Sequence, residues 1–376
     1  MNRRFEVLDA FRGLCALAVL VHHIRISGSL TEYSFFRNSD VFVEFFFVLS
    51  GFVLMHSYGF RKGTSFHEFI TSRFFRIYPL HLFMLIIVIM IECGKLIAYY
   101  YGDFNFNNAP FSNRFALSEL VPNLLLIQSW TNFSHNTSFN FPSWSISVEF
   151  YLYVIFFIFL SLLGKVRNIL FLLIPIVIAV LEYISFDLFT SFARTGIICF
   201  FFGVSTYLFY SNIKSLDGKF TLSNKWGSFL EVLSVSIVIY HVSYGKTFST
   251  FYLATLFSFV ILVFSFESGY LSSIFKNKIF STYGKLSYSM YMTHVAIIFI
   301  VTSFVMIIQK LFGLNLTYSV DGVRFLLVDN VILANLLLFM VIIATTLISN
   351  WTYRQVELRG QSLGRKVNLS LLLNYK

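Results

Sequence analysis

Apolar residues run in long blocks along this chain, and short polar stretches separate the blocks. A helix needs about 20 mostly apolar residues to cross the hydrocarbon core of a bilayer. The pattern predicts membrane-spanning helices at 8–26, 40–58, 77–99, 145–163, 168–185, 195–211, 228–243, 248–266, 288–309 and 329–350. The predicted fold class is therefore an all-α polytopic membrane protein, a single bundle of about ten transmembrane helices that forms one domain over residues 1–376.

Two segments outside these blocks are predicted to lie at the membrane surface. The apolar stretch 116–130 is short and contains Glu119 and Pro122, so we expect it to be interfacial or re-entrant. The tail after residue 350 is short and basic, and it is expected to lie on the membrane surface. Ten crossings place both termini on the same side.

The distribution of positive charge indicates which side that is. Of the 28 Lys and Arg residues, 19 fall in the termini and the alternate loops on one side of the predicted bundle. Six fall in the loops on the other side, and Arg12, Arg25 and Lys95 lie in spans or at their ends. Because cytoplasmic loops carry the excess of Lys and Arg, both termini are predicted to be cytoplasmic and the loop 100–143 external.

Composition excludes several other classes of protein. Apolar residues make up 57% of the chain and charged residues only 12%, and the mean hydropathy is +0.74. Soluble domains are about 25% charged, and disordered chains are more polar still. The net charge of +10 is then explained by loops beside a membrane rather than by nucleic acid. Cys15, Cys93 and Cys199 lie in apolar runs without metal-ligand spacing, so no metal site is predicted.

Ionisable residues inside predicted spans are functional candidates because they are costly in hydrocarbon. Arg12 and His23 lie eleven residues apart on the first span, which is three helical turns plus about 20°. They therefore share one helix face, separated by roughly 16 Å along the axis. The alternative is that Arg12 extends to the lipid headgroups and His23 bonds a neighbouring carbonyl.

Two carboxylates are predicted at the depth of His23. Glu44 begins the second span and Glu149 begins the fourth, and both spans run inward from the external side. A carboxylate that orients an imidazole, which then takes a proton from a hydroxyl, is a general-base arrangement. The alternative is a buried ion pair that fixes the register of the helices.

Cations and aromatic residues are predicted nearer the cytoplasmic side. Arg73 and Arg76 precede the third span, with Pro79 in its first turn, and their planar donors suit phosphate. Tyr288, Tyr291 and His294 form a polar stripe in the cytoplasmic half of the ninth span. Ordinary positive flanking residues and ordinary helix contacts are the alternatives for these two groups.

These segments together resemble the membrane-bound acyltransferase type 3 family, many of whose members O-acylate bacterial surface glycans. The matching motifs occur in the order of the family and are Leu8–His23, Phe46–Phe52, Arg73–Pro79, Trp144–Glu149 and Lys285–His294. Two positions depart from the family. Glu44 stands where the family usually has Asp, and Phe150 follows Glu149 where many members have a second Glu.

The resemblance implies transfer of an acyl group, usually acetyl, from cytoplasmic acyl-CoA to a sugar hydroxyl, in a bacterial cytoplasmic (inner) membrane. It makes His23 the catalytic base, with Glu44 or Glu149 as its partner. The residues that it implies for the donor are Arg73 and Arg76 at the CoA phosphates, Arg12 along the channel, and Tyr288, Tyr291 and His294 as its lining. Direct transfer and an acyl-histidine intermediate both remain open, and no permanently bound cofactor is implied.

The expected partners are acyl-CoA, the lipid bilayer and a carbohydrate acceptor such as exopolysaccharide, capsule or O-antigen. The loop 100–143, with Trp130 and His135, is a candidate for acceptor binding. A transporter or flippase for a glycan intermediate is the main alternative, since charges inside a membrane also mark transport paths. A succinyl or other acyl transferase on a different acceptor, and a non-catalytic assembly partner, are further alternatives.

Overall fold

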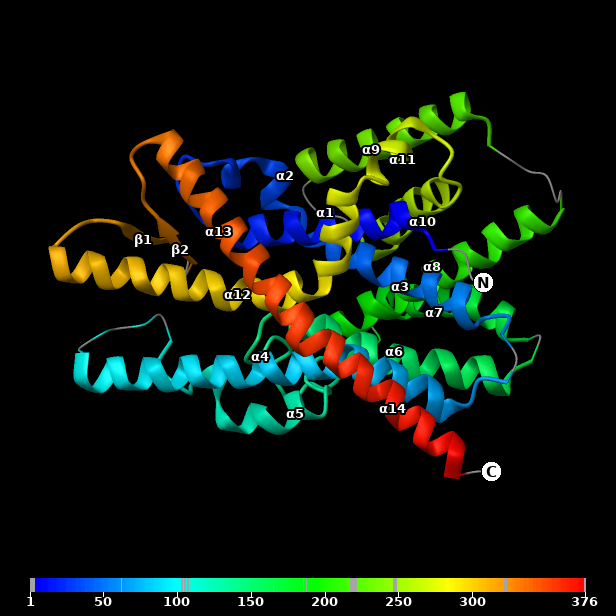
Figure 1. Ribbon diagram of the computed structural model, residues 1–376, viewed down its shortest axis with the longest axis horizontal. Helices are drawn as coiled ribbons and strands as arrows, with labels where there is room; N and C mark the ends of the chain where they lie inside the picture. Colours follow the sequence, from blue (N-terminus) through cyan, green and yellow to red (C-terminus); the bar gives the residue numbers. More distant parts are fainter. Residues whose placement is uncertain are drawn as a thin grey trace. The chain divides into compact units, whose positions relative to one another are not determined.

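The computed structural model (Figure 1) describes residues 4–374 except 62, 103, 105, 107, 165, 185, 187, 217–221, 246–248, 321 and 322. Six of the cations counted above lie outside the described residues, namely Arg3, Lys62, Lys165, Lys219, Lys246 and Lys376. The last residue of the predicted span 168–185 and the first of the span 248–266 lie outside them as well.

Each of the ten predicted spans coincides with a helix. The helices are α1 Glu6–His23, α3 Phe42–Tyr58, α4 Phe66–Gly102, α6 Ser143–Leu162, α7 Arg167–Tyr183, α8 Ser191–Leu216, α9 Asn224–Tyr244, α10 Thr250–Ser265, α12 Lys278–Phe312 and α13 Val331–Thr352. The short helices are α2 Ser34–Arg37, α5 Leu120–Leu124 and α11 Tyr270–Phe275. A π-helical turn, Tyr353–Glu357, joins α13 to α14 Leu358–Asn374.

Extended structure in the described part of the chain is confined to one antiparallel hairpin. Strands β1 Thr317–Val320 and β2 Val323–Leu326 follow α12 and pair in the register Thr317↔Leu326 to Val320↔Val323. The far end of β2 also bonds the segment after α1, where the Ser27 N–H donates to the Leu326 carbonyl at 2.9 Å. The other regular elements that the structure describes are helices, in agreement with the predicted class.

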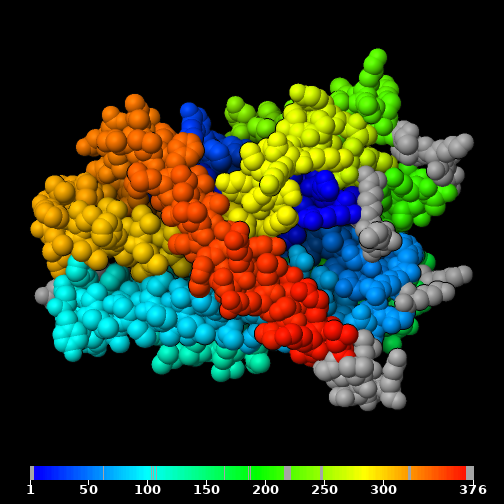
Figure 2. Space-filling model, viewed as in Figure 1, coloured from blue at the N-terminus to red at the C-terminus, as the bar shows by residue number. Residues whose placement is uncertain are grey.

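Seven segments of the described chain are long and apolar enough to cross a membrane. Helices α7 and α10 have only 17 and 16 residues, and α1 carries Glu6, Asp9 and Arg12 within its 18. In Figure 2, α13 lies at the surface in orange to red, and its exposed side chains include Ile332, Leu336, Phe339, Met340 and Ile343. Apolar side chains exposed along whole helices are expected in lipid, so this is a multi-pass membrane protein.

The contacts within the chain divide it into two compact units. Unit 1 comprises residues 1–15, 40–71 and 148–287, and unit 2 comprises residues 16–39, 72–147 and 288–376. Helices α1, α4, α6 and α12 each contribute residues to both units. Each unit is described below by itself.

Unit 1 is built on a close crossing of α3 and α8. A Cβ atom added to Gly51 would lie 1.9 Å from the Phe200 carbonyl oxygen, and one added to Gly203 would lie 1.8 Å from that of Val48. Only glycine permits backbones to approach so closely, as at other helix contacts in membranes. Stacked rings complete this core beside the crossing, including the pairs Phe156–Phe171 and Phe171–Phe201.

Unit 2 is organised by α4 and α12, which lie side by side and run in the same direction (Figure 1). Near their first turns in unit 2, the Tyr288 hydroxyl donates to the Ile77 carbonyl at 2.6 Å. Near their far ends, Lys310 Nζ donates to the Gly102 carbonyl at 2.7 Å. The two helices therefore remain in register over about 25 residues, or roughly 37 Å.

One prediction about this unit was wrong, and the fold of the tail was not predicted. Helix α4 begins at Phe66 rather than at 77, so Pro79 lies inside the helix and not in its first turn. The basic tail forms α14, which packs on α4: a Cβ at Gly360 would lie 2.6 Å from Pro79 Cγ, and one at Gly364 would lie 2.6 Å from Phe75 Cβ. The proline ring removes a backbone donor from α4, and glycines allow α14 to approach at that point.

We predict that Gly203→Ala lowers the melting temperature of the protein in detergent. The added methyl group would overlap the Val48 carbonyl and force α3 and α8 apart, at a cost of about 1–3 kcal/mol. The control is Gly94→Ala in α4, because nothing lies within 4 Å of a Cβ there. Equal melting of the two variants would contradict the close crossing.

Candidate active site

The two histidines of the predicted site meet in unit 2. His23 ends α1 and His294 lies in α12, and their ring centroids are 4.9 Å apart. His23 is half-buried, and His294 is buried with 1% of its surface exposed. Phe141 also packs against His23, with ring centroids 5.4 Å apart. The sequence predicted each histidine as a site residue but not that they are neighbours.

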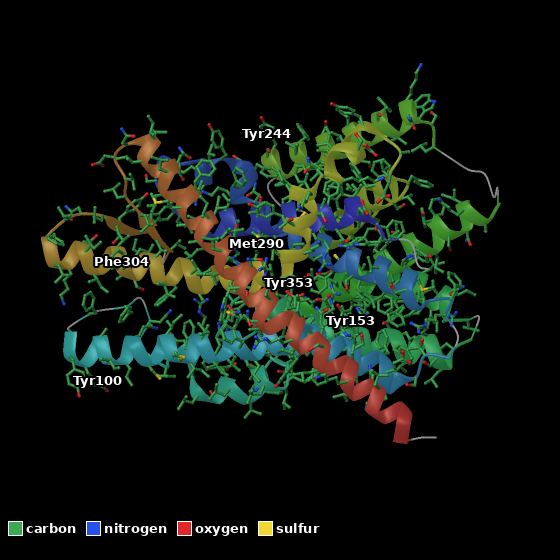
Figure 3. The ribbon with its side chains drawn as sticks, viewed as in Figure 1. Tyr100, Tyr153, Tyr244, Met290, Phe304 and Tyr353 are labelled. Carbon is green, nitrogen blue, oxygen red and sulfur yellow. The ribbon has the colours of Figure 1, made fainter. Side chains whose placement is uncertain are left out.

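Backbone carbonyls fix the tautomer of both neutral rings. His23 Nδ1 lies 2.9 Å from the Val19 carbonyl oxygen, and His294 Nδ1 lies 3.2 Å from that of Met290, a residue labelled in Figure 3. A carbonyl only accepts, so the proton of each neutral ring is on Nδ1. No described residue bonds Nε2 of either ring, and Nε2 of His294 is buried. Both Nε2 atoms therefore present lone pairs that can take a proton.

The two histidines were predicted at different depths, and the structure brings them to one level. With the ninth span predicted to begin at residue 288, His294 was placed in the cytoplasmic half and His23 near the external end. Helix α12 instead begins at Lys278, so His294 lies about 24 Å from its start. Hydropathy alone does not show where such a helix begins, because polar residues continue the helix beyond the apolar block.

Tyr288 and Tyr291 hold α12 against its neighbours in unit 2. Tyr288 donates to Ile77 of α4, as described above, and the hydroxyl groups of Tyr291 and Ser145 lie 3.0 Å apart. The Tyr291 ring also packs on His294, with centroids 5.9 Å apart. Tyr291 is therefore a neighbour of the histidine pair, and Tyr288 lies about 9 Å from His294 along α12.

A cationic pocket of about 190 Å³ lies between α4 and α14 in unit 2. Its lining residues are Ser72, Arg73, Phe75, Arg76, Gln361, Gly364, Arg365 and Asn368. The sequence predicted the two arginines of α4 but missed Arg365, since the tail was not expected to fold back on α4. The path along the helix axes from Arg73 to Ile77, and then from Tyr288, which bonds Ile77, to His294, is roughly 15 Å long.

Three predicted site residues belong to unit 1. Arg12 forms an ion pair with Asp9 one turn earlier on α1, at 3.9 Å. Glu149 accepts hydrogen bonds from Ser50, at 2.7 Å, and from Tyr153, which Figure 3 labels. Glu44 is half-buried on α3. Within unit 2, the Val19 carbonyl orients His23 through Nδ1, and a carboxylate partner for His23 stays a prediction.

The loop that was predicted to bind the acceptor is ordered largely by its own polar side chains. Trp130 donates to the Ser147 carbonyl at 3.1 Å, and His135 bonds Thr137 of the same loop. Buried Glu119 accepts from Ser134 and from the His135 N–H. Other residues of this loop, Arg114, Asn140 and Phe141, line a second pocket that is described below. Among the described residues, no three His, Cys, Asp or Glu side chains gather as metal ligands.

One unit of this helical membrane protein thus holds a histidine pair and a pocket suited to anions. The profile of the acyltransferase type 3 family, described as an acyltransferase domain, matches residues 5–354. The chain therefore belongs to this family.

Two curated relatives match parts of the chain. The acyltransferase MdmB of Streptomyces mycarofaciens is 33% identical over 177 residues, which are 43% of this chain and 41% of the relative. Protein 2 in the picA locus of Rhizobium radiobacter is 40% identical over 88 residues, 22% of this chain and 42% of that protein. The matches thus span less than half the length of either relative. No solved structure matches the chain.

We predict that Glu149→Ala lowers the melting temperature, because the hydroxyl groups of Ser50 and buried Tyr153 would lose their shared acceptor. A lost partner of this kind costs about 1–3 kcal/mol. Glu149→Gln keeps an acceptor oxygen and should melt closer to the wild type. If Glu149→Ala melts like the wild type, the carboxylate has no structural role.

Proposed function

We propose that this protein transfers an acetyl group from cytoplasmic acetyl-CoA to a hydroxyl group of a surface or exported carbohydrate. We place it in a bacterial cytoplasmic membrane with both termini inside. The observation that carries the proposal is the histidine pair: His23 has Nδ1 bonded to Val19 and Nε2 uncommitted, beside His294. Membership of the family supports acyl transfer, and the charge asymmetry of the loops supports the orientation.

His23 acts as the general base in this proposal. Its Nε2 accepts the proton of the acceptor hydroxyl while that oxygen attacks the thioester carbonyl. A carbon–oxygen bond forms, the carbon–sulfur bond breaks, and the thiolate leaves with the proton as free CoA. Phe141 and the nearly inaccessible His294 restrict water beside the base, which favours transfer over hydrolysis.

The cationic pocket between α4 and α14 receives the phosphates of the donor. Arg73, Arg76 and Arg365 bring three guanidinium groups to one pocket of this unit, and their planar donors match phosphate oxygens. From this pocket, the thioester end of an extended donor reaches the histidine pair along α12, past Tyr288 and Tyr291. The predicted donor residues of unit 2 thus form one path.

The test of this function is transfer of radiolabelled acetyl groups from acetyl-CoA to membrane glycans by protein reconstituted in lipid. Wild type should produce base-labile label in the glycan fraction, and His23→Ala should reduce the rate by at least about 10²-fold, the typical contribution of a general base. The matched control is His22→Ala, since His22 is directed to the Phe36 carbonyl instead, at 3.2 Å. Equal transfer by wild type and His23→Ala would contradict the proposed role.

A second prediction concerns the donor pocket. Arg365→Gln should raise the KM for acetyl-CoA about tenfold and leave kcat nearly unchanged, because one charge-assisted contact to phosphate is lost. Arg359→Gln removes the same charge from the same helix outside the pocket and is the control. Adenosine 3′,5′-bisphosphate should compete with the donor in the wild type and about tenfold more weakly in Arg365→Gln. An unchanged KM in Arg365→Gln would place the phosphates elsewhere.

A further inference from the structure

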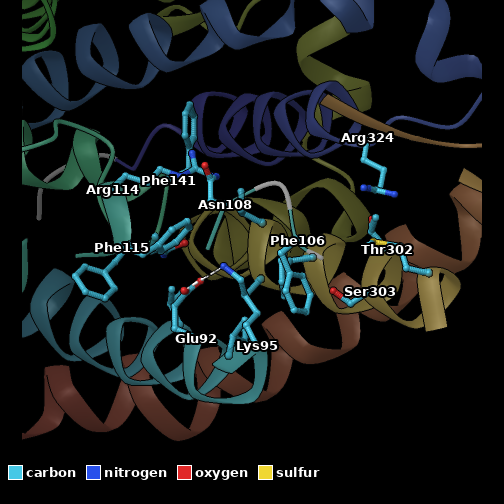
Figure 4. Close-up of a pocket in the computed structure, with 18 residues that line it drawn as sticks. Glu92, Lys95, Phe106, Asn108, Arg114, Phe115, Phe141, Thr302, Ser303 and Arg324 are labelled. Atoms are coloured by element: carbon cyan, nitrogen blue, oxygen red, sulfur yellow. Dashed lines mark hydrogen bonds and ion pairs between the residues drawn. The ribbon is translucent and has the colours of Figure 1, made fainter. Parts of the chain in front are cut away.

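A second pocket, of about 230 Å³, lies in unit 2 between α4, α12 and the loop that connects α4 to α6 (Figure 4). Its α12 wall runs from Val295 to Met306, so it begins directly after His294 and extends about 16 Å toward the Lys310 end. The arginine pocket lies on the other side of the histidine pair along the same helices. A donor and a second substrate could therefore approach the pair from opposite directions.

The loop wall of this pocket contacts the catalytic pair directly. Phe141 lines the pocket and packs on His23. Asn140 lines it too, and its Nδ2 donates to the Met292 carbonyl, two residues from His294, at 3.1 Å. The Asn140 side chain is only 2% exposed, and its Oδ1 has no partner among the described residues. A buried amide oxygen without a donor is costly, and a ligand hydroxyl in this pocket would satisfy it.

The carboxylate that lines this pocket, that of Glu92, is already paired with a cation. Lys95 Nζ donates to both oxygens of Glu92, at 2.8 and 3.1 Å (Figure 4). The Phe111 N–H also donates to Oε2, at 3.0 Å. Lys95 also lies over the Phe106 and Phe115 rings, with its nitrogen 5.5 and 5.0 Å from their centroids. Glu92 and Lys95 therefore bind each other within the wall of the pocket, and together they add no net charge to it.

The cations that remain give the pocket a positive balance. Arg114 and Arg324 line it from the loop and from β2, and no other described lining residue is acidic. Arg114 stacks on Phe115, with 4.9 Å from its guanidinium carbon to the ring centroid, and it forms no ion pair with a described carboxylate. Its Nε is buried without an acceptor. Partial burial lowers the pKa of Arg114, and the Glu92 charge opposes that shift.

From this geometry we propose that the pocket is the acceptor site and that it takes an acidic sugar, with the carboxylate bound by Arg114 and a hydroxyl bound by Asn140. The inference rests on the proposed function and names its substrate class. Arginine binds carboxylates with two parallel hydrogen bonds, and the aromatic wall suits the apolar face of a sugar ring. An acidic sugar held in this way places its other hydroxyl groups toward His23, next to Phe141.

The experiment measures binding without any donor, by calorimetry on the full-length protein in lipid nanodiscs. The probes are p-nitrophenyl β-D-glucuronide and p-nitrophenyl β-D-glucoside, which differ only at C6, a carboxylate in the first and a hydroxymethyl group in the second. Wild type should bind the glucuronide about tenfold more tightly, and Arg114→Gln should lose that preference. Arg114→Lys keeps the charge without the planar fork and should retain part of it. Arg359→Gln, which removes an exposed cation of the same unit outside the pocket, should keep all of it.

Thr302→Asp and Thr302→Asn provide a second pair if Arg114→Gln does not fold. Thr302 lines the pocket from α12, so the added carboxylate should weaken glucuronide binding while the neutral amide should not. The proposal is overturned if wild type shows no preference for the glucuronide, or if the preference survives in both Arg114→Gln and Thr302→Asp. His23→Ala separates the two proposals, since it should lose acetyl transfer and still bind the glucuronide. If wild type transfers acetyl groups but shows no preference for the glucuronide, only the acidic acceptor is rejected. If wild type prefers the glucuronide but transfers no acetyl groups, only the proposed function is rejected.

Discussion

The parallel packing of α4 against α12 is the constraint on which the site depends. Two polar contacts to backbone carbonyls, from Tyr288 to Ile77 and from Lys310 to Gly102, fix the register of the two helices at both ends. Polar groups in a membrane must find partners within the protein, so such contacts tolerate little sliding. This register sets the arginine pocket, the histidine pair and the second pocket at successive levels along the same pair of helices.

The site combines fixed backbone contacts with uncommitted side-chain atoms. Nδ1 of His23 and Nδ1 of His294 each bond a carbonyl of the same helix. Neither ring needs a partner from another helix for this bond, and Nε2 stays available. Glu92 and Lys95 neutralise each other within the wall of the second pocket, so the remaining charge there is positive. A membrane protein can in this way present a base and a cationic surface at one place without burying an unpaired carboxylate.

Hydropathy alone predicted the helical class and the location of ten of the helices, because their apolar blocks are long and separated by polar loops. It could not predict the ends of α4 and α12, which continue as helices well beyond their apolar blocks. It also predicted His23 and His294 at different depths, whereas their rings are neighbours. Arg365 and Arg114 were missed for another reason: they reach their pockets through the fold of the tail and of a long loop, which carry no periodic signal.

The central claim is that donor, base and acceptor meet along the α4–α12 axis. A cryo-EM structure of the protein with a non-hydrolysable acetyl-CoA analogue tests it most directly. The account predicts nucleotide density at Arg73, Arg76 and Arg365 and the acetyl end of the analogue beside His23 and His294. Nucleotide density away from these arginines, or an acetyl end out of reach of both histidines, would contradict it.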